Sequence, residues 1–178
     1  MGHFIDIIVA GARRSRGYSE KLLAGVRPEQ AARKPRFETA GAATVIDTNH
    51  PVWVCGHLAL YPAMAMERLG LNAGGATCPN DWTALFDVAS VCKDDEKGTI
   101  YPKLDVVASQ FFKATDVALD AISQLDDAAL LRETADEKTR AAFPMVGMSV
   151  NFLLNNHVMM HLGQVSAWRR CFGMPSAL

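Results

Sequence analysis

Apolar residues recur at spacings of three and four in four long stretches of the chain, which is the period of an amphipathic α-helix. These stretches cover about residues 3–25, 49–70, 103–122 and 148–172. A shorter helix is predicted from Asp126 to Glu133. No β-strand alternation and no internal repeat stand out. Four amphipathic helices joined by long loops predict an all-α protein, a four-helix bundle with long crossover loops.

The second helix carries two informative prolines. Asn49 or His50 can cap its start, and Pro51 suits the first helical position, where a missing N–H costs nothing. Pro62 lies inside the apolar pattern and predicts a kink or a break at Tyr61.

Composition and charge limit the number of domains and the kinds of partner to expect. The chain has 178 residues, of which 49% are hydrophobic and 21% charged, so we expect one globular domain over residues 1–178. The net charge of −1 gives no reason to expect nucleic acid or an anionic membrane as a partner. Neither a signal peptide nor an apolar run of about 20 residues is found, which predicts a cytoplasmic protein. Cys55, Cys78, Cys92 and Cys171 form no C-x-x-C pair and indicate reduced thiols.

Two histidines of the fourth helix supply the candidate chemistry. His157 and His161 are four residues apart, so both rings lie on one helical face, separated by about 6 Å along the axis. His57 lies in the apolar second helix, about a hundred residues earlier. One inward histidine on the second helix can meet two on the fourth if those helices are neighbours. We therefore predict one divalent-metal site formed by His57, His157 and His161.

Each part of this pattern also has a plainer interpretation. A lone histidine on an apolar face, such as His57, is usually a hydrogen-bonded core residue, and the H-x-x-x-H spacing arises by chance in many helices. The three together favour a metal. Imidazole suits zinc, nickel, iron and copper, and three protein ligands leave a coordination position open for water or substrate, as catalytic sites require.

Four further residues are candidates for the surroundings of the site or its pocket. Gln164 follows His161 by three residues and could orient a ligand. Tyr61 lies one turn beyond His57 and could hydrogen-bond a metal-bound water, or pack as a core aromatic. Trp53 is expected in the core. His50 is about 10 Å from His57 along the helix, where it could line a pocket mouth but more simply caps the helix or faces solvent.

Other common catalytic signatures are not found. No helical carboxylate stands next to a histidine in the E-x-x-H spacing of di-iron bundles, which disfavours oxygen-activating di-iron chemistry. The sequence contains no P-loop, no G-x-S-x-G element and no Rossmann fingerprint.

The two histidine motifs resemble those of the DinB/YfiT-like superfamily. Residues 53–59 (WVCGHLA) are similar to its second-helix motif, and residues 157–165 (HVMMHLGQV) with WRR at 168–170 are similar to its last-helix motif. Chain length and the gap between the motifs fit as well. The resemblance implies a four-helix bundle with a three-histidine site, usually holding zinc or nickel, and often a homodimer.

The resemblance also carries an expected chemistry. Characterised branches of the superfamily are metal-dependent enzymes of low-molecular-weight thiols, namely bacillithiol and mycothiol S-transferases and a mycothiol-dependent maleylpyruvate isomerase. It implies a thiol S-transferase whose partners are a small-molecule thiol and an electrophile. One departure is Val158, since family members commonly carry an acidic residue directly after the first histidine of the pair.

Two alternatives remain beside this expectation. The histidines could hold a metal that only anchors the helices, in a non-catalytic or stress-related bundle, and Val158 favours that interpretation. The same three ligands could also support hydrolysis by a metal-bound water.

Overall fold

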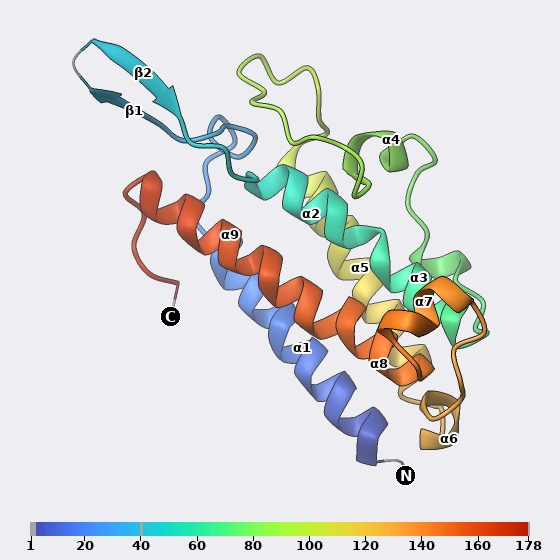
Figure 1. Cartoon of the computed structure of the whole chain (residues 1–178). Helices are drawn as coiled ribbons and strands as arrows, with labels where there is room; N and C mark the ends of the chain where they lie inside the picture. The colour runs from blue at the N-terminus through green and yellow to red at the C-terminus, as the bar shows by residue number, and fades with distance from the viewer. Residues whose placement is uncertain (1–2, 40, 178) are drawn as a thin grey trace.

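The computed structural model describes residues 3–39 and 41–177. Four long helical segments pack along one another in the described chain (Figure 1). They are α1 (His3–Leu23); α2 (Pro51–Ala59) followed by α3 (Tyr61–Arg68); α5 (Leu104–Ile122); and α8 (Val146–Asn151) continued by the π-helical segment η2 (Phe152–Asn156) and α9 (His157–Cys171). The predicted all-α four-helix bundle is confirmed.

The four segments run in two opposite directions, with two segments in each direction. α1 and the α8–α9 segment point one way, while α2–α3 and α5 point the other way (Figure 1). Because α3 and α5 lead in the same direction, the chain between them must return along the length of the bundle. This return is the long crossover over residues 69–103, and it passes close to α2, where His57 lies.

The predicted signals in the second helix are both present. The ring of His50 accepts a hydrogen bond from the backbone N–H of Trp53, and Pro51 occupies the first turn. The helix is interrupted at Leu60, between α2 and α3, because Pro62 has no N–H with which to continue the hydrogen-bond ladder.

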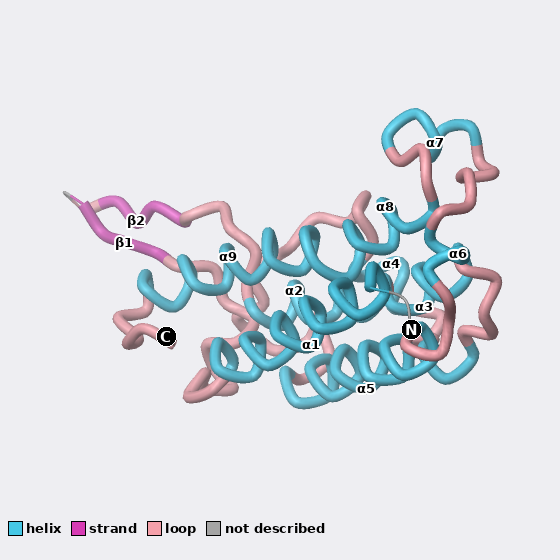
Figure 2. The backbone as a smooth tube through the Cα atoms, turned by 90° about the horizontal axis from the view of Figure 1, so that it is seen from below, coloured by secondary structure: helices cyan, strands magenta, loops and turns pink. Residues whose placement is uncertain are grey.

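The crossovers contain small elements. α6 (Asp127–Leu130) lies inside the predicted helix at 126–133, whereas η1 (Gly74–Ala76), α4 (Trp82–Phe86) and α7 (Glu137–Ala142) were not predicted. Figure 2 shows α6 and α7 at one end of the bundle and a β-hairpin projecting at the other. None of the helices in the described ranges combines the length and apolar character needed to cross a membrane.

The hairpin corrects the expectation that the chain has no strands. β1 (Arg36–Thr39) and β2 (Ala42–Val45) pair in antiparallel register, with Arg36 opposite Val45. All eight strand residues are exposed, so neither face is buried and no alternation of apolar and polar residues is needed. Gly41 takes the positive φ of 84° that the tight turn requires.

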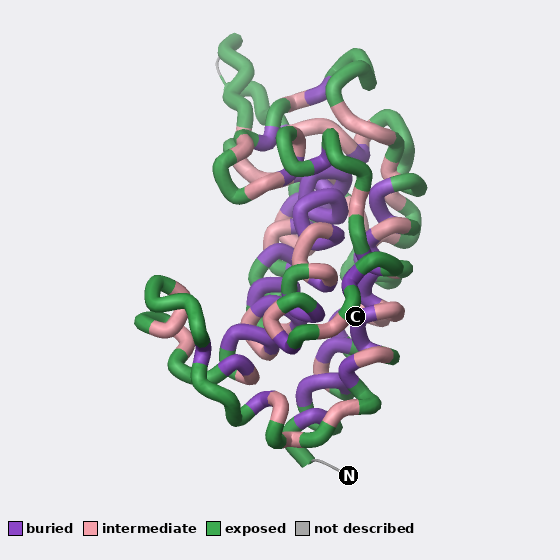
Figure 3. Tube along the Cα trace, turned by 90° about the vertical axis from the view of Figure 1, so that its right-hand side faces the viewer, coloured by how far each residue is buried: buried purple, intermediate pink, exposed green. Residues whose placement is uncertain are grey.

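Buried residues concentrate along the bundle helices, while the hairpin and most loop residues are exposed (Figure 3). They form two apolar clusters. One contains Ala65 and Met66 of α3 with Leu153 and Leu154 of η2, and the other contains Leu58 of α2 with Val158 and Leu162 of α9. His157 lies between Leu154 of the first cluster and Val158 of the second, whereas His57 and His161 lie among residues of the second cluster.

Candidate metal centre

The side chains of His57, His157 and His161 converge between α2 and α9. The Nε2 atom of His157 lies 3.2 Å from Nε2 of His57 and 3.0 Å from Nε2 of His161. The three side chains are only 2%, 7% and 7% exposed. The predicted meeting of one histidine from the second helix with two from the fourth is therefore present.

The local helix geometry aims these rings. His157 and His161 are one turn apart on α9, so both point to the same side. The π-helical segment η2 ends at Asn156, directly before His157, and its wider turn changes the helical face from that point onward. π-helical turns inside α-helices are frequently found at functional sites.

A glycine brings a backbone acceptor to His57. A Cβ atom on Gly56 would lie 2.5 Å from ring atoms of Phe86, a distance that no packed structure tolerates. Glycine at this position lets Phe86 of α4 pack directly on α2. As a result, the carbonyl oxygen of Phe86 lies 2.6 Å from Nδ1 of His57.

This contact fixes the tautomer of His57. A carbonyl can only accept, so Nδ1 carries the proton and donates to Phe86. Burial lowers the pKa of His57, and this effect is opposed by the Phe86 hydrogen bond and by the charge of Asp87. His57 is therefore neutral near pH 7, with the lone pair of Nε2 facing the centre of the cluster.

Gln164 fixes the tautomer of His161 in the same way. Its Oε1 atom lies 3.0 Å from Nδ1 of His161 and also accepts from the side-chain amide of Asn49, again at 3.0 Å. The ring thus donates from Nδ1 and presents the lone pair of Nε2. Burial and the nearby His57 lower the pKa of His161 to about 4, against the opposing effect of the hydrogen bond that its ring donates to Gln164.

His157 is the least constrained of the three. Its Nδ1 atom is buried and has no hydrogen-bond partner in the described part of the protein. The ring of Phe152 stacks on it at 5.6 Å between centroids. Burial, followed by the effects of His161 and His57, lowers the pKa of His157 to about 4, so this ring is also neutral.

The donor set fits a divalent metal. Three neutral imidazoles offer ligand atoms within 4.8 Å of one another, and the Nε2 lone pairs of His57 and His161 both face Nε2 of His157. Tetrahedral zinc with bonds of about 2.05 Å requires ligand atoms about 3.3 Å apart, close to the observed 3.0 and 3.2 Å. The cluster could therefore hold a metal ion through its Nε2 atoms, and His57 and His161 would keep their Nδ1 hydrogen bonds to Phe86 and Gln164.

Tyr61 and Trp53, both singled out in the sequence, touch the cluster. The Tyr61 hydroxyl lies 3.2 Å from Nε2 of His57, and its ring meets that of His157 edge-on at 4.3 Å. Burial raises the pKa of Tyr61 to about 12, so its hydroxyl keeps its proton. Trp53 stacks on His57 at 4.6 Å between ring centroids, and its indole N–H donates to the hydroxyl of Ser90.

His50 lies elsewhere. Its contacts are with the start of α2 and with the crossover, since Nε2 lies 3.0 Å from the carbonyl oxygen of Lys93 and the ring meets Tyr101 edge-on. It caps the helix, as one of the sequence alternatives stated. The solvent-facing alternative is wrong, because the side chain is fully buried.

Sequence reasoning missed two residues of the site. Phe86 contributes a backbone carbonyl, and Asp87 contributes a charge that acts on both His57 and Tyr61. Val158, which stands where an acidic residue was expected from the resemblance, is buried in an apolar cluster. Among the described residues, Asp87 is thus a carboxylate close enough to influence two members of the site.

The larger cavities do not open on this cluster. One of about 900 Å³ lies between the ends of α1 and α5, and one of about 1010 Å³ lies along α1 and η2. Neither is lined by any of the three histidines. Of the residues that contact the histidines through hydrogen bonds, Tyr61 and Gln164 are partly exposed.

Comparison with known proteins identifies the family. The sequence profile of the DinB superfamily matches residues 12–165, which include all three histidines and most of the bundle. The chain therefore belongs to the DinB superfamily. Neither the curated proteins nor the solved structures contain a significant match to it.

Proposed function

We propose that this DinB superfamily protein is a metal-dependent S-transferase that joins a low-molecular-weight thiol to a small electrophile. The observation that carries the proposal is the convergence of His57, His157 and His161, with the tautomers of two of them set by Phe86 and Gln164. Three protein ligands leave a fourth position for substrate, which is the arrangement of catalytic sites. Zinc and nickel are the ions that we expect, since both suit imidazole.

The reaction is a substitution at the electrophile. A divalent ion beside a thiol lowers the pKa of that thiol and so raises the fraction of thiolate at neutral pH. The thiol gives up its proton, its sulfur forms the new S–C bond with a lone pair, and the leaving group departs with the electrons of the bond that breaks.

The surrounding residues divide the remaining tasks. Tyr61 stays protonated and lies beside Nε2 of His57. We therefore assign its hydroxyl a hydrogen bond to a substrate bound beside the three histidines. Val158 has no titratable group, and we assign acceptance of the thiol proton to Asp87, which is half-buried and acts on both His57 and Tyr61. Trp53 keeps the His57 ring in position.

Burial of the cluster favours a second candidate. The three histidines are at most 7% exposed, and neither large cavity reaches them. In this alternative the same ligands hold a metal that ties α2 to α9, and the protein has no reaction to catalyse. Such a metal would contribute to folding stability and would not exchange ligands with added thiol.

Cobalt substitution separates the two candidates. Cobalt(II) has a visible spectrum that responds to its ligands, and the probe is N-acetylcysteine, with N-acetylserine as the matched compound without a thiol. For the transferase we expect a new sulfur-to-cobalt band with N-acetylcysteine only. If neither compound changes the spectrum and a chelator strongly destabilises the protein, the transferase is rejected in favour of the structural metal.

A further inference from the structure

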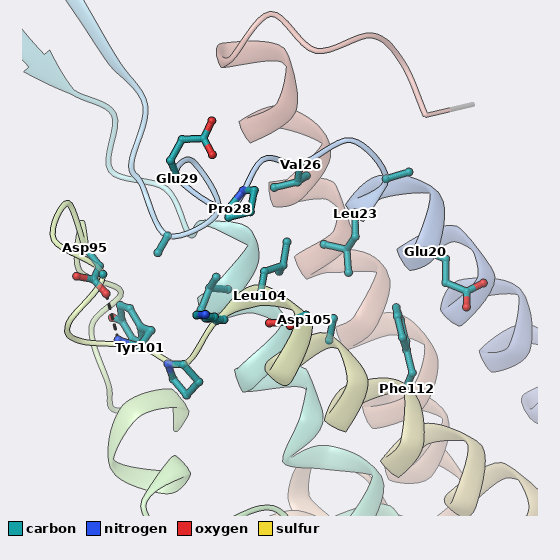
Figure 4. A pocket seen from close by; sticks show the side chains of 17 residues that line it. Glu20, Leu23, Val26, Pro28, Glu29, Asp95, Tyr101, Leu104, Asp105 and Phe112 are labelled. Atoms are coloured by element: carbon teal, nitrogen blue, oxygen red, sulfur yellow. Dashed lines mark hydrogen bonds between the residues drawn. The ribbon is translucent and has the colours of Figure 1, made fainter.

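The cavity of about 900 Å³ lies at the end of the bundle where α1 finishes and α5 begins. Its walls also include the segment after α1, residue 52 of α2 and part of the crossover before α5 (Figure 4). None of the residues that line it is among those that contact the three histidines. It is therefore separate from the metal centre.

Apolar side chains form most of the interior. Leu23, Leu104 and Phe112 come together between α1 and α5 in Figure 4. The guanidinium of Arg16 covers the Phe112 ring at 4.7 Å from its centroid, and Ala108 contributes only a methyl group to the wall. A preformed apolar cavity of this size matches the usual dimensions of small-molecule sites.

Carboxylates dominate its charged lining. Glu20, Glu29, Asp95 and Asp105 line the cavity, against one ammonium group from Lys103. The C-terminal end of α1 and the N-terminal end of α5 both lie here, and their opposite half-charges offset each other. Lys103, together with Arg16 and Arg27, which pair with Glu20 and Glu29, offsets three of the four negative charges, so a small excess of negative charge remains.

The four carboxylates differ in what they can offer. Asp95 is buried and accepts hydrogen bonds from the backbone N–H groups of Thr99, Ile100 and Tyr101, so its carboxylate stabilises the loop before α5. Glu20 and Glu29 pair with Arg16 and Arg27 but remain more than half exposed.

Asp105 is exposed, and among the described residues the partner of its carboxylate is the N–H of the next residue, Val106. Asp105 and Glu20 flank the apolar wall (Figure 4). They are the two carboxylates that can meet a ligand seated against it.

We propose that this cavity binds an organic cation with an apolar body, its hydrophobic part against Leu23, Leu104 and Phe112 and its ammonium group at the edge of that wall, beside Asp105 or Glu20. The site is independent of the metal centre and of the reaction proposed for it. Its selectivity comes from charge at the rim and its affinity from burial of apolar surface.

The probe is dansylcadaverine, which joins a fluorescent apolar ring system to a primary ammonium, and the matched neutral compound is its N-acetyl derivative. We expect the cation to bind about tenfold more tightly than the neutral compound at low salt, since two exposed carboxylates each contribute modestly. That preference should shrink toward about 1 M salt, where charges are screened within about 3 Å.

Substitutions inside and outside the cavity test where the two probes bind. Glu20→Gln with Asp105→Asn should reduce the preference for the cation to within about twofold, and Ala108→Phe should weaken both probes by filling the cavity. The exposed carboxylate of Glu137, on α7 at the other end of the bundle, provides the control Glu137→Gln, which should change nothing. His161→Ala should also leave binding unchanged.

The proposal has several ways to fail. It is overturned if neither probe binds at millimolar concentration, if the neutral compound binds as tightly as the cation, or if the double variant keeps the preference. Loss of binding in His161→Ala alone would also overturn it. If Ala108→Phe does not fold, as judged by circular dichroism, the charge variants still decide.

Discussion

The chain buries histidines in two different ways. His50 at the start of α2 and His161 at the centre of the cluster are both buried, and burial lowers the pKa of each to about 4. His50 has a protein partner for each nitrogen, since Nδ1 accepts from Trp53 and Nε2 donates to Lys93. His161 has one such partner, Gln164, and its Nε2 faces another imidazole.

This difference separates a structural histidine from a candidate ligand. Burial and a lowered pKa occur in both places, so neither property identifies a metal site. What distinguishes the cluster is that the Nε2 atoms of three imidazoles meet at one position, with the lone pairs of His57 and His161 directed toward it. The predictions below are designed to break or sharpen this contrast.

The largest effect is expected from removing the metal. A ligand present at about a thousand times its dissociation constant stabilises the folded state by about 4 kcal/mol, so a chelator should lower the free energy of unfolding by that amount. His50→Asn should lose as much on chelation as the unaltered protein, while His161→Ala should lose almost nothing. Urea unfolding with and without chelator measures this. A wild-type protein indifferent to the chelator would remove the contrast.

Truncating His50 should lower the stability of the protein and leave its metal content unchanged. His50→Ala removes the cap of α2 and leaves the N–H of Trp53 and the carbonyl of Lys93 without their partners, at a cost of about 2–3 kcal/mol. His50→Asn keeps a capping acceptor and should cost less than His50→Ala. Thermal unfolding compares the two variants, and a loss of bound metal in either would contradict the assignment of His50 as purely structural.

Gln164 tests whether the fixed tautomer matters. Gln164→Leu leaves Nδ1 of His161 without its acceptor and should weaken metal binding by about 10- to 100-fold. Gln164→Glu restores an acceptor, and a charged one, so its affinity should equal or exceed that of the unaltered protein. Competition with a chromophoric chelator gives both affinities. Equal affinity in the Leu and Glu variants would show that this hydrogen bond does not tune the ligand.

The smallest effect is a change in pH dependence. The pKa of His50 is lowered from 6.5 to about 4, so between these values the unfolded chain binds a proton that the folded protein does not. Stability from this group is complete above pH 6.5 and falls as the pH decreases toward 4, by at most about 1.4 kcal/mol per pH unit. His50→Asn should reduce this slope in metal-free protein, in which the three clustered histidines also contribute to it, and urea unfolding at pH 5 and pH 7 measures the reduction. An unchanged slope would place the titration elsewhere.

The bundle and the candidate ligands follow from side-chain patterns. The spacing of His157 and His161 fixes their common face, and the apolar surroundings of His57 turn it inward, so their convergence requires only that α2 and α9 be neighbours. Pro62 likewise predicts an interruption at Tyr61, one residue from the observed break at Leu60, because a missing N–H acts locally.

Other parts of the site depend on tertiary contacts that no local pattern encodes. The acceptor for His57 is the backbone carbonyl of Phe86, 29 residues away, and a carbonyl carries no residue-specific signal. Gly56 is the one trace of this contact in the sequence, since a glycine in an apolar helix often marks a close approach. The hairpin over residues 36–45 escaped notice because it buries neither face.

The central claim is that the cluster binds a metal and His50 does not, and elemental analysis of protein purified without an affinity tag tests it most directly. The samples are the unaltered protein and the variants His57→Ala, His161→Ala and His50→Asn. We expect about one zinc or nickel ion per chain in the unaltered protein and in His50→Asn, and almost none in the other two. Metal-free wild-type protein even after reconstitution, or metal retained in both cluster variants, would contradict the account.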